Sequence, residues 1–127
     1  MDLPKKERSF YFKHIGEETG FVYEGNFTIK CTLNIGEKRL MELELSRLQG
    51  DMQNGTNQLK AIASTISILR AKIVEAPEWW KQGGGMFIED ESAVVELLNK
   101  VDEISSSYRK DLVSKVKAES KEAEPGN

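Results

Sequence analysis

The residues best suited to acid–base chemistry gather around the first predicted turn, where His14 lies near Glu17, Glu18 and Glu24. An imidazole beside carboxylates could serve as an acid and base or hold a metal ion. No nucleophile accompanies them at a spacing that would identify a catalytic site. We therefore favour the simpler interpretation, in which these side chains belong to a solvated turn, and we expect a protein that is not an enzyme.

Two further patterns are typical of ligand-binding loops but lack residues that such loops need. Three glycines at 83–85 precede Met86 and then acids, whereas a phosphate-binding loop needs a following lysine or a fixed glycine spacing. The acidic run at 88–91 lacks the alternating carboxylates of a calcium loop. One cysteine, Cys31, and one histidine cannot form a zinc site of nitrogen and sulfur ligands. We expect no cofactor and no metal, and the glycines predict a flexible connector.

Composition narrows the class of protein. A chain of 127 residues suffices for one domain with one core. Apolar residues make up 39% and charged residues 31%, which is typical of a soluble, helix-rich protein. The net charge of −3 comes from interleaved signs without a basic block, so we expect no nucleic-acid partner. Apolar runs are short and the first residues do not read as a secretory signal, so we expect no membrane contact and a cytoplasmic location.

Both tryptophans of the chain stand side by side, just after Pro77 and just before the three glycines. Neighbouring side chains differ in direction in a helix or a strand, so the two cannot both face one core. We expect one to pack in the core and the other to lie at the surface, cover a helix end or contact a partner. Tryptophan is enriched among interface hot spots. The predicted interaction residues are Trp79, Trp80 and Phe87, supported by Phe21 and Tyr23.

Strands are expected in the first third of the chain. In a first predicted strand, Phe10 and Phe12 lie on one side. Gly16 and Gly20 can close a turn between this strand and the main strand that follows it. Gly25 indicates a bend or a bulge. The alternation of apolar and polar residues that predicts the main strand involves Phe27, Ile29, Cys31, Leu33 and Ile35.

Three helices are expected after the strands. The first follows Gly36 and ends at Gly50, although part of it also alternates like a strand. The second ends before Pro77, and we favour packing of its apolar stripe inside the domain over a seam for another chain. The third runs from about Asp90 to Lys117, with Asp90 or Ser92 as its N-cap. The stripe of the second helix comprises Leu59, Ile62, Ile66, Leu69 and Ile73.

These patterns predict an α+β fold, with an N-terminal antiparallel β-hairpin of two or three strands followed by three helices. We expect one domain over residues 9–117, preceded by an N-terminal arm at residues 1–8. Residues 118–127 are charged and lack large apolar side chains, so they are expected to form a disordered tail.

The segments follow a characteristic order: a G-x-F-x-x-K strand, a charged leucine helix, an Ala/Ile-rich helix closing on A-P-E-W-W, a glycine loop and a last helix. In this order the chain resembles a group of small bacteriophage proteins from the tail-morphogenesis region, similar to the tail assembly chaperones of long-tailed phages. The resemblance covers residues 12–112, and A-P-E-W-W is its most specific element. The chain departs from the pattern at Tyr108, where a tryptophan is expected.

The resemblance implies a non-enzymatic chaperone in the cytoplasm of the bacterial host. Its partner would be unassembled tail tube or tape-measure protein, with possible self-association and a frameshifted longer form. One alternative is a structural virion component (a head–tail connector, a capsid-associated protein or a tail protein) that binds through its β-hairpin and tryptophan pair. Another is a host-side regulator or small enzyme, but the sequence shows neither a basic recognition face nor an identifiable catalytic pocket.

Overall fold

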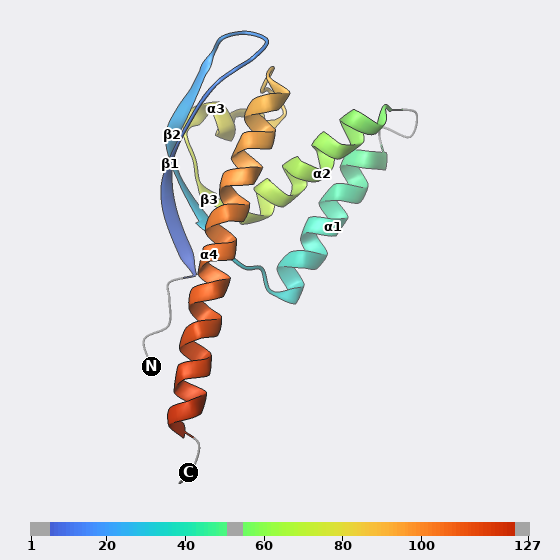
Figure 1. The fold of residues 1–127 in the computed structure, drawn as a ribbon. Helices are drawn as coiled ribbons and strands as arrows, with labels where there is room; N and C mark the ends of the chain where they lie inside the picture. The colour runs from blue at the N-terminus through green and yellow to red at the C-terminus, as the bar shows by residue number, and fades with distance from the viewer. Residues whose placement is uncertain (1–5, 51–54, 124–127) are drawn as a thin grey trace.

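The structure, a computed structural model, describes residues 6–50 and 55–123, and its fold is α+β as predicted (Figure 1). In this part of the chain, three antiparallel strands form one sheet in the order β1-β2-β3. Helices follow the hairpin and flank the short third strand. The strands are β1 (Glu7–Ile15), β2 (Val22–Lys30) and β3 (Ile73–Glu75), and the helical elements are α1 (Ile35–Gly50), α2 (Asn57–Lys72), α3 (Glu78–Lys81), the 3-10 turn η1 (Gln82–Gly85) and α4 (Glu91–Ala123).

The predicted hairpin is present, and its alternation is confirmed. β1 and β2 pair in continuous register from Glu7 opposite Lys30 to Ile15 opposite Val22. Side chains on one face of both strands point to the core, while Tyr11 on the other face is 55% exposed. Period two places alternate residues on opposite faces, so one face of the hairpin is apolar. The buried residues of this face are Phe12, Tyr23, Phe27 and Ile29, and Cys31 just beyond β2 is also buried.

The second strand ends earlier than the alternation predicted. β2 stops at Lys30, and Ile35, which is 86% exposed, already belongs to α1. A reciprocal cap explains the change: Asn34 Oδ1 accepts from the backbone N–H of Glu37 at 2.8 Å, and the Glu37 carboxylate accepts from the N–H of Asn34 at 3.0 Å. Such a capping box begins a helix, and here it overrides the strand-like pattern.

Gly25 does not mark a bulge in the hairpin, because the β1–β2 register is unbroken and Gly25 pairs with Phe12. Because glycine has no side chain, Gly25 instead allows Pro77 to lie close to the backbone of β2. A Cβ atom at this position would lie 2.8 Å from Cβ of Pro77. The irregularity of the sheet falls on its other side, between Thr28 and Ile29 where β2 meets β3.

Within residues 6–50 and 55–123, the α-helices number four rather than three. The second does not continue to Pro77: it ends at Lys72, and Ile73 begins β3, where it pairs with Ile29. α3 is a single turn that starts after Pro77, followed directly by η1. A turn of four residues has no apolar periodicity to reveal it.

The predicted domain limits also change. β1 begins at Glu7, inside the expected arm of residues 1–8. α4 begins at Glu91 and continues to Ala123, so the expected disordered tail at 118–127 starts as helix. The ends at 1–5 and 124–127 lie outside the described residues.

The core lies between one face of the sheet and the helices α2, α3 and α4 (Figure 1). Leu69 of α2 and Leu97 and Val101 of α4 are fully buried there. α1 instead runs beside α2, on the side away from the sheet, and has no buried residue. The sheet, α3 and the start of α4 are therefore the part of the molecule that positions the predicted interaction residues.

Candidate protein-binding pocket

The two tryptophans project from α3 in different directions, as adjacent helical residues must. Trp80 points into the core and is 4% exposed. Its ring lies against Gly85, where a Cβ atom would come within 2.7 Å of the indole. The prediction that one tryptophan packs in the core is confirmed, and Trp80 is that residue. At this exposure it offers almost no surface to a partner, and its role in protein binding stays a prediction.

Trp79 is half-buried at the edge of the core, where three aromatic rings contact it. Its ring centroid lies 6.2 Å from that of Phe12, 5.2 Å from that of Tyr23 and 5.6 Å from that of Phe27. The indole N–H donates to the backbone carbonyl of Glu24 at 2.9 Å. Because its polar atom already has a partner, what Trp79 offers to the outside is apolar surface.

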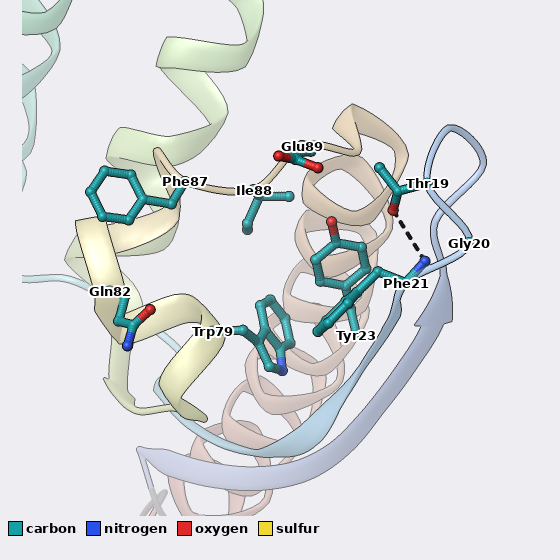
Figure 2. Close-up of a pocket in the computed structure, with 9 residues that line it drawn as sticks. All are labelled: Thr19, Gly20, Phe21, Tyr23, Trp79, Gln82, Phe87, Ile88 and Glu89. Carbon is teal, nitrogen blue, oxygen red and sulfur yellow. Dashed lines mark hydrogen bonds between the residues drawn. The ribbon is translucent and has the colours of Figure 1, made fainter.

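A pocket with a volume of about 430 Å³ opens beside Trp79 (Figure 2). One wall comes from the hairpin, where the ring centroids of Phe21 and Tyr23 lie 4.8 Å apart. The opposite wall comes from the segment between η1 and α4, which includes Phe87. We call this the aromatic pocket; its lining residues are Thr19, Gly20, Phe21, Tyr23, Trp79, Gln82, Phe87, Ile88 and Glu89.

Four of the five predicted interaction residues therefore line one pocket, although they are up to 66 positions apart in the chain, from Phe21 to Phe87. Two of them are well exposed, Phe21 at 52% and Phe87 at 72%. Tyr23 and Trp79 form the more buried base. Only Trp80 is placed elsewhere. A role for the four in protein binding stays a prediction.

Asp90 holds the hairpin wall in place. Its Oδ1 accepts from the backbone N–H groups of Glu18 and Thr19 at 2.8 and 3.0 Å. Its Oδ2 accepts from the hydroxyl groups of Thr19 and Tyr23 at 2.6 and 2.7 Å. The hydrogen bonds from Thr19 and then Tyr23 lower the pKa of Asp90 from 3.8 to about 2, because they stabilise the ionised carboxylate.

The sequence assigned Asp90 only a possible capping role at the last helix. Its side chain instead spans to the hairpin turn, and Gly16 makes room for it: a Cβ atom there would lie 2.2 Å from Oδ2. The only sequence signals were an aspartate before a helix and a glycine in a turn. Neither indicates a contact across more than 70 positions.

The three glycines do not form a loose connector. All have positive φ (73°, 55° and 93°), and they build the tight turn η1. Arg70 of α2 donates to the carbonyl groups of Gly84 and Gly83 at 2.8 and 2.9 Å. Glycine adopts positive φ at little steric cost, which explains the run of three. The turn is thus held by hydrogen bonds, and it leads directly into Phe87.

The acidic cluster of the first turn is divided between different partners. His14 Nε2 lies 2.9 Å from Ser92 Oγ. Glu24, on the other face of β2, accepts a hydrogen bond from the hydroxyl group of Tyr11. Within residues 6–50 and 55–123, no three His, Cys, Asp or Glu side chains lie close enough to hold a metal ion. Over the same residues, no helix is both long and apolar enough to cross a membrane.

No protein family, curated protein or solved structure matches this chain.

Proposed function

We propose that the chain is a non-enzymatic protein-binding factor of phage tail assembly, acting in the bacterial host cytoplasm as a chaperone for unassembled tail tube or tape-measure protein. The observation that supports this proposal is the aromatic pocket, with Phe21, Tyr23, Trp79 and Phe87 around one opening. Aromatic residues provide a large apolar contact area and are characteristic of protein-binding hot spots.

The pocket suits apolar side chains of a partner. Its volume of about 430 Å³ lies in the range of sites that enclose small ligands. Trp79 is held by three rings and a hydrogen bond, and Tyr23 by Asp90, so the base requires little ordering on binding. A tape-measure protein, as a long helical protein with apolar faces, would present side chains of this kind.

The two exposed rings at the rim of the aromatic pocket, Phe87 and Phe21, are expected to contribute binding free energy when a partner covers them. Phe87 is 72% exposed and Phe21 is 52% exposed. Covering the remaining surface of each ring would contribute about 1–2 kcal/mol. Exposed rings such as Phe21 and Phe87 also lower solubility, and binding of a partner to a chaperone would cover them.

The test is co-expression with the tail tube and tape-measure proteins of the phage that encodes the chain, followed by affinity measurement on the recovered complex. Phe87→Ala and Phe21→Ala should each weaken binding by about tenfold. Met86→Ala is the matched control, because Met86 is 50% exposed beside Phe87 but does not line the pocket. Equal affinities for all three variants and the unmodified chain would contradict the proposal.

A second candidate is a structural virion component, favoured by the free edge of the sheet. β1 is nine residues long and forms ladder hydrogen bonds with β2 only; no other described strand pairs with it. An edge strand of this length can accept a strand from a neighbouring subunit. Mass spectrometry of mature particles and of infected-cell lysate distinguishes the two. A chaperone is abundant in the lysate and absent from particles, whereas a virion component is present in particles at fixed stoichiometry.

A further inference from the structure

A second cavity lies between α1, α2, α4 and the segment that follows β2. Its volume is about 380 Å³. None of the residues of the aromatic pocket contributes to it. We call it the cationic cavity; its lining residues are Cys31, Thr32, Leu33, Lys38, Met41, Glu42, Ile68, Lys72 and Arg109.

Three cations from three different helices line this cavity, against one carboxylate, Glu42. Lys38 comes from α1, Lys72 from α2 and Arg109 from α4. None of the three forms an ion pair with a carboxylate among the described residues, although seven other basic residues do. Glu42 in the lining and the nearby charge of Asp102 offset part of this charge, and the lining keeps a net excess of positive charge.

Hydrogen-bond donors are also in excess. The ammonium group of Lys72 has three N–H donors and makes two bonds, to Ser105 Oγ at 3.2 Å and to the carbonyl oxygen of Cys31 at 3.5 Å. Arg109 has five donors and makes one bond, to Ser106 Oγ at 3.1 Å. Burial lowers the pKa of Lys72; the charge of Asp102 opposes this shift, and the charge of Arg109 adds to it. A bound anion would offset both effects.

The remaining wall is apolar. Leu33, Met41 and Ile68 line the cavity between the cations. A ligand made only of charged oxygens would leave these side chains without contact, and a purely apolar ligand would leave the cations without acceptors. The fitting ligand combines an anionic head with an apolar body.

We propose that the cationic cavity binds a small organic anion, a carboxylate carried on an aliphatic stem. The carboxylate accepts hydrogen bonds from Lys38, Lys72 and Arg109, and the stem packs against Leu33, Met41 and Ile68. This site is independent of the aromatic pocket and of the function proposed for it.

Octanoate serves as the probe in an NMR titration of the isotope-labelled full chain. Saturable shifts are expected at the backbone amides of Leu33 and Ile68. Octanol, which lacks the charge, and inorganic phosphate, which lacks the stem, should each bind at least about tenfold more weakly, because each forgoes half of the contacts. The proposal is wrong if octanoate gives no saturable shift, or if either comparison compound binds as tightly.

Matched variants locate the site. Lys38→Gln and Arg109→Gln should each weaken octanoate binding by about tenfold, the effect of one charge-assisted hydrogen bond. Arg39→Gln and Lys110→Gln change the net charge equally on the neighbouring exposed positions, which do not line the cavity, and should leave binding unchanged. Equal weakening by all four would reduce the effect to overall charge and overturn the assignment.

Discussion

The hydroxyl group of Tyr23 donates a hydrogen bond of 2.7 Å to Oδ2 of Asp90, joining residues 67 positions apart. The same carboxylate accepts three further hydrogen bonds from Glu18 and Thr19 at the tip of the hairpin. A single buried side chain in front of α4 therefore sets the position of one wall of the aromatic pocket.

Asp90→Asn should destabilise the protein and loosen the hairpin tip. The carboxylate faces only donors, so the amide NH₂ group of asparagine would meet an N–H or O–H donor in place of an acceptor. We expect a lower thermal midpoint and faster amide hydrogen exchange at Glu18 and Thr19. Asp102→Asn is the control, since Asp102 is exposed on α4, the helix that Asp90 precedes. Identical midpoints for the two variants would show that the Asp90 network contributes nothing.

Acid should weaken the fold through the same residue. The pKa of Asp90 is about 2 in the folded chain against 3.8 ordinarily, so ionisation favours folding. This contribution is complete above about pH 4 and is lost as the pH falls from 3.8 towards 2. Urea unfolding between pH 2 and 6 measures it. The pH dependence of Asp90→Asn should be shallower than that of the unmodified chain in this window; parallel curves would refute the assignment.

Trp80→Ala should cost about 3–5 kcal/mol of unfolding free energy, because it empties a core site beside Gly85. Phe87→Ala removes a ring that is 72% exposed and should change stability by no more than about 0.5 kcal/mol. Chemical denaturation followed by circular dichroism compares the two. A stable Trp80→Ala protein with impaired partner binding would instead show that this residue contacts the partner.

Gly85→Ala should be more damaging than Gly20→Ala. Both glycines have positive φ, at 93° and 76°, so alanine is strained at either position by about 1–2 kcal/mol. Only at Gly85 does the added Cβ also meet the Trp80 ring, at 2.7 Å, whereas nothing lies within 4 Å of it at Gly20. We expect a further loss of about 1–3 kcal/mol from this overpacking, measured as the difference in urea unfolding. Equal losses would mean that the turn yields to accommodate the methyl group.

The fold class could be read from the sequence because it depends on local periodicity. Phe10 and Phe12 on one face of β1, and Phe27 and Ile29 on one face of β2, follow from alternation alone. The predicted ends of the second strand and of the second helix were wrong because another interaction of the same residues was stronger than the periodic pattern. The Asn34–Glu37 cap ended the strand-like run, and pairing with Ile29 turned Ile73 from helix to strand.

The sequence selected four of the nine residues that line the aromatic pocket, together with the buried Trp80, and their role in protein binding stays a prediction. Aromatic type and an abrupt chain break selected Trp79 and Phe87, and the structure adds that they share a pocket with Phe21 and Tyr23. Which tryptophan enters the core depends on how α3 is rotated against the sheet, and no pattern within four residues encodes that rotation.

The sequence by itself determined the hairpin, the amphipathic helices and the choice of large aromatic residues, since each rests on neighbours within a few positions. The tertiary structure alone decided that Trp80 is buried and Trp79 borders a pocket, that Asp90 holds a distant hairpin, and that Lys38, Lys72 and Arg109 share a cavity. These relationships join residues from separate elements. They exist only once the burial of apolar faces has brought those elements together.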